Sequence, residues 1–217
     1  MIRVLARSCC AALLLAPGPA LAHGGGPDRL LPVDAWPLAA MLLAGSLYAS
    51  GLVRCRRRLG RWPKAHSGPH IAALGAGFAL LALALLSPLE VWSGEILSAH
   101  MIQHVILIAL APPLFVYGRA EPIMAGGLPG PLRRSLARGW LRRIADGLAP
   151  FATPMPAALI HAAAVWIWHA PLAFDAAAQS PGLHFLEHVC FFGTSLLLWR
   201  ALARCARDAA AIPGGLA

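Results

Sequence analysis

Residues Ser98–Gly118, SAHMIQHVILIALAPPLFVYG, form an almost wholly apolar run that opens with two histidines. It is long enough to cross a membrane as a helix, because about 20 apolar residues span the hydrocarbon core. His100 and His104 are four residues apart and therefore share one helix face. Ionisable side chains are costly within a bilayer, so this pair indicates a functional site at one end of a spanning helix.

The composition of the chain also indicates an integral membrane protein. Of its 217 residues, 59% are hydrophobic and 12% are charged, and the mean hydropathy is +0.66. A soluble domain carries about 25% charged residues. The five cysteines include no C-x-x-C pair, so we expect neither a structural disulfide nor a dithiol copper site.

Five apolar runs are long enough to span a membrane, and no alternating strand pattern is present. We therefore predict an all-α polytopic membrane helix bundle, formed by one domain over residues 23–217. Pro112 and Pro113 remove two backbone donors and should kink or end the third helix. The predicted helices cover about 36–53, 70–88, 99–117, 152–168 and 183–199.

Residues 1–22 are typical of a secretory signal peptide. Arg3 and Arg7 form its basic end, a short apolar run follows, and Ala20–Ala22 is a small-residue cleavage site. Pro17 shortens the apolar run, which favours cleavage over the alternative of an uncleaved first helix. Cleavage leaves the mature chain with its N-terminus outside the membrane.

The net charge of +9 reflects membrane topology rather than nucleic-acid binding. The arginines and the lysine concentrate in segments 54–64, 119–143 and 200–207, whereas the alternate connections carry Glu90 and Asp175 and no cation. Cytoplasmic loops are enriched in Lys and Arg, so we predict the N-terminus outside and the C-terminus in the cytoplasm. The basic loops can contact anionic membrane lipid, and 132–148 is either an amphipathic helix or a solvated loop.

This topology brings histidines from three helices to the outer membrane face. His184 and His188 form a second i,i+4 pair, and Glu187 lies three residues after His184 on the same face. His169 ends the fourth helix at that side, and His161 lies about two turns deeper. Paired side chains on facing helices build metal and cofactor sites in bundles, so we predict a metal or haem role for this group.

The residues leave the identity of the metal open. Imidazole suits copper, zinc and iron, and a thioether from Met101 would favour Cu(I). Glu187 could be a ligand, a partner that fixes an imidazole tautomer, or a base. HFLEH, 184–188, fits the H-x-x-E-H motif of zinc hydrolases, and two axial histidines could instead hold haem in a membrane b-type cytochrome.

Four blocks of the sequence resemble the CtaG-type cytochrome c oxidase assembly factor family, over about Trp36–Trp199. The H-M-x-Q-H block followed by A-P-P-L, and the W-H-x-P block followed by H-x-x-E-H, are specific in combination. The blocks are LYASGLVRCRRRLGRWP, LLSPLEVWSGEILSAHMIQHVILIALAPPLFVYGRAEP, WIWHAPLAFDAA and LHFLEHVCFFGTSLLLW.

The resemblance implies a multi-pass protein of the bacterial inner membrane that is needed for maturation of a haem–copper oxidase. Such a protein is not an enzyme; it would bind copper at its outer face and act on cytochrome c oxidase subunits. The family's histidines fall on His100, His104, His169, His184 and His188 of this sequence.

Overall fold

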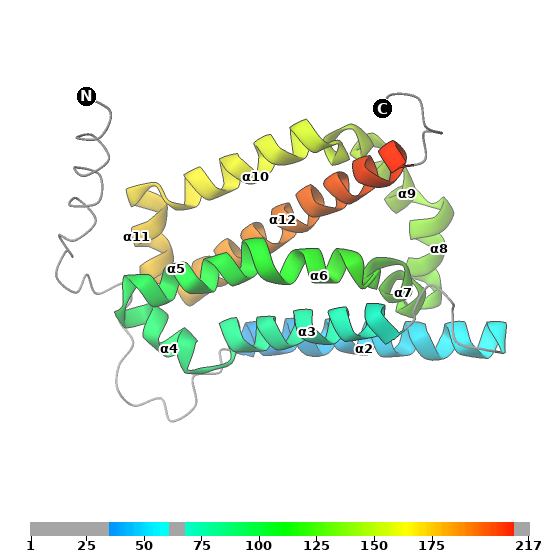
Figure 1. Ribbon diagram of the computed structural model, residues 1–217, viewed down its shortest axis with the longest axis horizontal. Coiled ribbons are helices and arrows are strands. Elements are labelled where there is room, and N and C mark those ends of the chain that lie inside the picture. Colours follow the sequence, from blue (N-terminus) through cyan, green and yellow to red (C-terminus); the bar gives the residue numbers. More distant parts are fainter. Residues whose placement is uncertain (1–34, 61–67, 211–217) are drawn as a thin grey trace.

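The computed structural model describes residues 35–60 and 68–210, which form a bundle of helices (Figure 1). The predicted signal peptide, 1–22, lies outside the described residues. In chain order the elements are α2 (Ala35–Leu59), α3 (Gly68–Leu85), α4 (Pro88–Glu95), α5 (Leu97–Val105), η1 (Ile106–Leu110), α6 (Ala111–Tyr117), α7 (Ala120–Gly127), α8 (Gly130–Arg138), α9 (Trp140–Gly147), η2 (Ala149–Ala152), α10 (Pro154–Trp168), α11 (Pro171–Gln179) and α12 (Pro181–Ala210).

The prediction of an all-α membrane bundle is confirmed. Among the described residues, four helical segments are long and apolar enough to span a membrane: α2, α3, the continuous α5–η1–α6 and α12. A fifth span results if α10 and α11, which are bent by 69° relative to each other, are counted together. The exposed apolar side chains fit this environment, since Leu172 is 86% exposed and Trp166 is 80% exposed.

Three of the helices differ in length from the prediction. α2 and α12 continue past the apolar runs to Leu59 and Ala210, because arginine is a good helix former and its long side chain can reach water from a helix end. The second helix ends at Leu85 rather than at residue 88. The side chain of Ser87 accepts a hydrogen bond from Leu89 N at 3.1 Å and so caps a new helix, α4.

The two prolines of the third span produce a π-helical turn, η1, and the helix then continues to Tyr117. In an α-helix the carbonyl of Ile108 would accept from residue 112, but Pro112 has no N–H. Ser195 Oγ and Trp199 Nε1 on α12 donate to that carbonyl instead, at 2.5 and 3.2 Å. Because of the prolines, the Ile108 carbonyl is left for side-chain hydrogen bonds from α12, and these bonds link the third span to α12.

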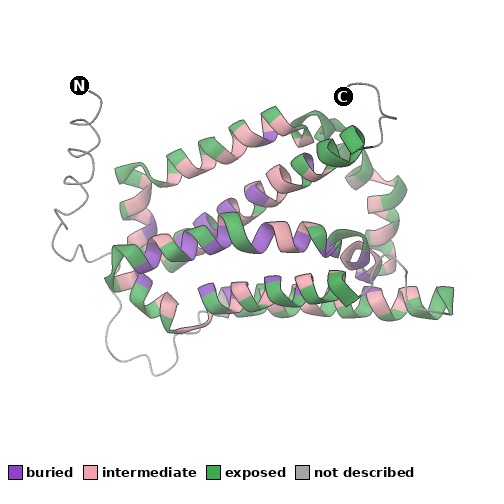
Figure 2. Ribbon diagram, viewed as in Figure 1, coloured by how far each residue is buried: buried purple, intermediate pink, exposed green. Residues whose placement is uncertain are grey.

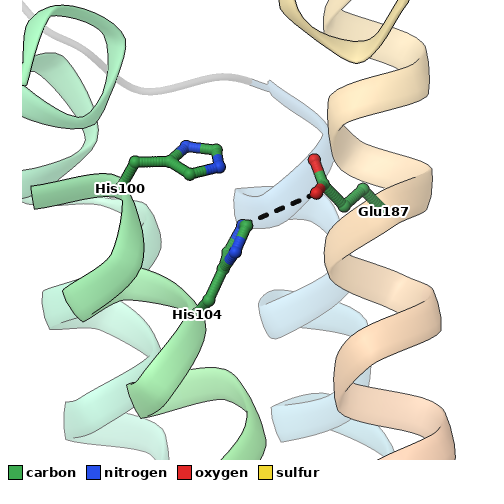
Figure 3. Close-up of side chains that lie close together, drawn as sticks. All are labelled: His100, His104 and Glu187. Carbon is green, nitrogen blue, oxygen red and sulfur yellow. Dashed lines mark ion pairs between the residues drawn. The ribbon is translucent and has the colours of Figure 1, made fainter. Parts of the chain in front are cut away.

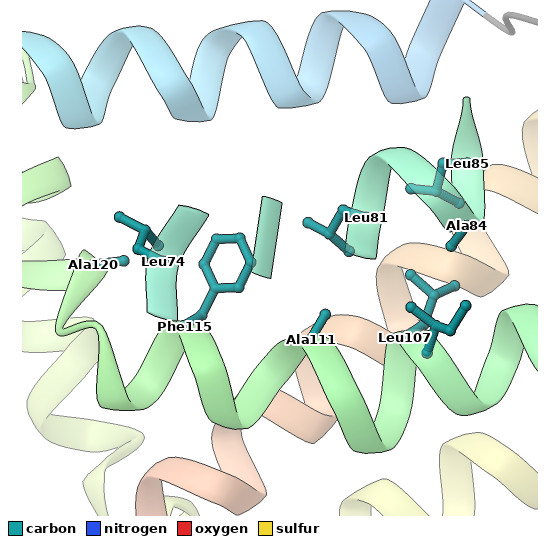
Figure 4. Close-up of a cluster of buried hydrophobic side chains, with 9 residues drawn as sticks. Leu74, Leu81, Ala84, Leu85, Leu107, Ala111, Phe115 and Ala120 are labelled. Atoms are coloured by element: carbon teal, nitrogen blue, oxygen red, sulfur yellow. The ribbon is translucent and has the colours of Figure 1, made fainter. Parts of the chain in front are cut away.

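The apolar core lies where α3 packs against η1 and α6 (Figure 4). Leu81, Leu107 and Phe115 project into this space from both sides. Figure 2 shows buried residues concentrated on α5, α6 and the facing side of α12, while the outer helix faces are exposed. The core thus fixes the third span against its neighbours and positions the first turns of α5.

Helix α7 is not one of the helices predicted from the sequence, and it packs closely along α2. Arg119 adopts a left-handed conformation, φ 50°, where the chain turns from α6 into α7. A Cβ atom on Gly51 would lie 1.9 Å from the carbonyl oxygen of Ile123, and one on Gly127 would lie 1.9 Å from that of Leu47. Only glycine permits this backbone approach, as at small-residue interfaces between membrane helices.

The two ends of the bundle differ in chemistry. Helices α4 and α11 and the first turns of α5 and α12 lie at one end, and α7, α8 and α9 lie at the other (Figure 1). Segment 132–148, for which the sequence left open an amphipathic helix or a solvated loop, is helical but forms two helices, because the chain is extended at Gly139 between α8 and α9. The paired histidines belong to the first end and most of the arginines to the second.

Candidate metal centre

Two histidine pairs meet at the end of the bundle where α5 and α12 begin. Within α5 the ring centroids of His100 and His104 are 4.1 Å apart, and within α12 those of His184 and His188 are 4.2 Å apart. Both pairs have i,i+4 spacing, which stacks side chains on one face of a helix. The sequence thus folds locally as the periodicity predicts.

The two pairs face each other across the interface between α5 and α12. The His100 ring lies 5.9 Å from that of His184, and the His104 ring lies 5.7 Å from that of His188. All of these side chains are buried, and the most accessible residue is 8% exposed. We call this group the histidine cluster: His100, His104, His184 and His188.

The carboxylate of Glu187 points from α12 towards the α5 pair (Figure 3). Its Oε1 atom lies 3.8 Å from His104 Nε2, and one ligand atom each from His100, His104 and Glu187 lie within 4.8 Å of one another. Within the described part of the chain, neither carboxylate oxygen accepts a hydrogen bond, although the residue is only 1% exposed. Both oxygens are therefore available to a ligand.

A second carboxylate reaches the histidine cluster from α4, which sequence reasoning did not anticipate. Oε1 of Glu90 lies 3.8 Å from His184 Nδ1. The side-chain amide of Gln103 donates to Oε2 of Glu90 and also, at 2.8 Å, to the carbonyl oxygen of Ala84. Gln103 thereby fixes α4 and its carboxylate against the end of α3.

His169, at the C-terminal end of α10, lies at the edge of the histidine cluster. Its ring is 5.6 Å from that of His104, and its residue is exposed. Its Nδ1 lies 2.8 Å from the carbonyl oxygen of Val165, which can only accept, so the proton is on Nδ1. The lone pair of Nε2 is consequently available to a ligand.

The two weaker candidates lie differently. Nδ1 of His161 is 2.9 Å from Thr194 Oγ1, whose hydroxyl donates to the carbonyl oxygen of Cys190, so His161 is the donor in a contact between α10 and α12. Met101 is half-buried on α5 and lies about 100° around the helix from His100. Metal ligation by either residue stays a prediction.

Aromatic rings enclose the histidine cluster. Phe174 on α11 lies 5.7 Å from the His100 ring, and Phe191 on α12 lies 4.7 Å from the His104 ring. These rings keep the surroundings apolar, and a low local dielectric strengthens electrostatic interactions between a cation and the two carboxylates. Chemically, the site offers imidazole nitrogens and carboxylate oxygens, which suit copper, zinc and iron.

A family model described as cytochrome c oxidase caa3 assembly factor (Caa3_CtaG) matches residues 46–215 of the chain. The match covers more than half of the sequence and includes every residue of the histidine cluster. No curated protein and no solved structure gave a significant match. The chain spans a membrane through apolar helices and belongs to the cytochrome c oxidase caa3 assembly factor family.

Proposed function

We propose that this protein binds copper in the histidine cluster and presents it to a cytochrome c oxidase subunit while the oxidase is assembled. The observation that carries the proposal is the meeting of two i,i+4 histidine pairs, from segments about 80 residues apart in sequence, in one buried group beside Glu187. The role of the family in oxidase assembly supplies the recipient.

The spacing of the donor atoms supports a small ion as the occupant. Imidazole bonds to zinc are about 2.0–2.1 Å long, and a tetrahedral ion with such bonds holds neighbouring ligand atoms about 3.4 Å apart. The ligand atoms of His100, His104 and Glu187 lie within 4.8 Å of one another, so these three residues are grouped closely enough to serve as ligands of one ion.

The packing favours such an ion over haem. A haem held by two histidines requires a planar slot between facing imidazoles. Here the rings of His100 and His104 contact each other at 4.1 Å, and a phenylalanine ring lies within 5.7 Å of each of them. We propose copper rather than zinc because the family assembles an oxidase, and that oxidase requires copper during its assembly. The zinc interpretation depends on the HFLEH motif alone.

The charge distribution supports an outward-facing site. Arginines gather at the end of the bundle that carries α7 to α9, so the positive-inside rule assigns that end to the cytoplasm and the histidine cluster to the outer face. His169 is exposed at that face and has its Nε2 lone pair available. It is positioned to exchange copper between the histidine cluster and an approaching partner.

Oxidase maturation tests this function in cells. The chain, or a His104→Ala/His188→Ala variant, is expressed in cells that lack their own copy, and the copper content and activity of the purified oxidase are measured. We expect the variant to yield oxidase deficient in copper, with haem retained. His70→Ala, at the opposite end of the bundle, is the matched control. Equal copper in the oxidase from both strains would contradict the proposal.

A further inference from the structure

A second candidate site lies at the basic end of the bundle, far from the histidine cluster. Arg54 and Arg58 on α2 and Arg133 on α8 line a pocket of about 150 Å³ between α2, α7 and α8. The backbone contact of Gly51 with α7 forms one wall of this pocket. Three arginine side chains therefore line one small space.

Arg54 is held in place by the end of α7. Its Nη1 atom donates to the carbonyl oxygens of Gly126 and Leu128, at 2.5 and 3.0 Å. These carbonyls lie where the helix dipole is negative, which a cation stabilises. The guanidinium of Arg54 is thus fixed at the pocket before any ligand binds.

Arg133 brings an unsatisfied donor to the same place. Its Nη1 atom is buried and forms no hydrogen bond within the described residues. Partial burial and the positive charges of Arg54, Arg58 and Arg134 lower the pKa of Arg133. Buried donors are costly without an acceptor, and like charges repel, so an anion would relieve both effects.

The nearby acidic side chains of α7 and α9 are engaged elsewhere. Glu121 on α7 pairs with Arg200 on α12, and Asp146 on α9 pairs with Arg142 at 2.9 Å. Among the described residues, no carboxylate forms an ion pair with Arg133. The positive charge of the pocket is thus not neutralised from within this part of the protein.

We propose that this pocket binds a phosphate group, carried by an anionic phospholipid or present as free phosphate. The forked guanidinium group matches phosphate oxygens and forms strong charge-assisted bonds with them. Basic pockets between spanning helices bind phospholipid headgroups. The adjoining helices α8 and α9 expose Leu132, Trp140 and Ile144 next to arginines, as interfacial amphipathic helices do, which places the pocket at headgroup depth.

Native mass spectrometry of the delipidated full-length protein in detergent tests the proposal. Phosphatidylglycerol is the probe, phosphatidylcholine is the reference lipid, and inorganic phosphate is titrated in a separate calorimetric arm. We expect Arg133→Gln to weaken phosphate-group binding about tenfold or more, since a hydrogen bond to a charged group is lost. Arg138→Gln, which removes the same charge from α8 outside the pocket, is the matched control.

The arms separate the two sources of phosphate. Selective retention of phosphatidylglycerol that Arg133→Gln abolishes identifies a lipid, whereas binding of inorganic phosphate alone, abolished by the same variant, identifies a free anion. Arg58→Gln, at the exposed rim of the pocket, is the second test variant, and its binding is measured in both arms if Arg133→Gln fails to fold. Equal binding by wild type and both pocket variants in both arms would overturn the proposal.

Discussion

The carboxylate of Glu187 and the imidazole of His104 lie 3.8 Å apart across the interface between α12 and α5. Each residue belongs to a separate histidine motif, so their approach joins the two motifs into one site. The pair is buried, with relative exposures of 1% and 4% for the two side chains.

Replacing Glu187 with glutamine should weaken copper binding without unfolding the protein. The substitution keeps the size of the side chain and replaces the carboxyl group that faces His104 with an amide. Loss of a group that orients or supplements metal ligands costs about 10–100-fold in affinity. Competition titration with a copper chelator measures this change. Glu95→Gln, at an exposed position of α4 at the same end, should leave the affinity unchanged.

Replacing Gln103 with leucine should destabilise the outer end of the bundle. The change deprives the Ala84 carbonyl of its hydrogen bond at 2.8 Å and removes the donor that holds Glu90. An unsatisfied buried group costs about 1–3 kcal/mol, so the free energy of unfolding in detergent should fall by that amount. Gln179→Leu at an exposed position of α11 is the control. The interpretation fails if both variants lose the same stability.

A double-mutant cycle can test the bond between the third span and α12. Ser195→Ala removes one donor to the Ile108 carbonyl and should cost about 1 kcal/mol of unfolding free energy. In a Pro112→Ala background the restored backbone N–H can satisfy that carbonyl, and the cost should shrink. Thermal unfolding of the four proteins in the cycle gives the coupling energy. An unchanged cost of Ser195→Ala in both backgrounds would show that the proline does not create the need for this donor.

Two glycines of α2 should respond in opposite directions to alanine. Gly51→Ala places a Cβ atom 1.9 Å from the carbonyl oxygen of Ile123 and should separate α7 from α2. Gly45→Ala meets nothing within 4 Å and should stabilise the helix slightly, by up to about 1 kcal/mol. Unfolding midpoints in detergent compare the two variants. Equal midpoints would contradict the close contact between the helices.

The sequence predicts the histidine pairs well because both pairs depend on local periodicity. The spacing of His100 and His104 places two imidazoles on one helix face wherever that helix packs, and Glu187 follows from its position beside His188. The apolar runs likewise predict the spanning helices, since the bilayer demands internally bonded backbone.

Glu90 and Gln103 could not be assigned in the same way. Glu90 reaches His184 only because the chain breaks after Leu85 and α4 folds back over the end of the bundle. Gln103 lies inside the H-M-x-Q-H block, but its contact with Ala84 depends on how α3 packs against α5. Such contacts arise from tertiary packing, which no local repeat encodes.

The copper content of the purified full-length protein is the decisive test of whether the histidine cluster binds copper. The protein is loaded with Cu(I) under reducing conditions and with Cu(II) under oxidising conditions, desalted, and analysed by elemental mass spectrometry. Wild type and His70→Ala should retain stoichiometric copper, and a variant with alanine at His100, His104, His184 and His188 should retain none while eluting as a folded protein. Failure of the wild type to retain copper in both oxidation states, or equal retention by the quadruple variant, would show that the histidine cluster is not a copper site.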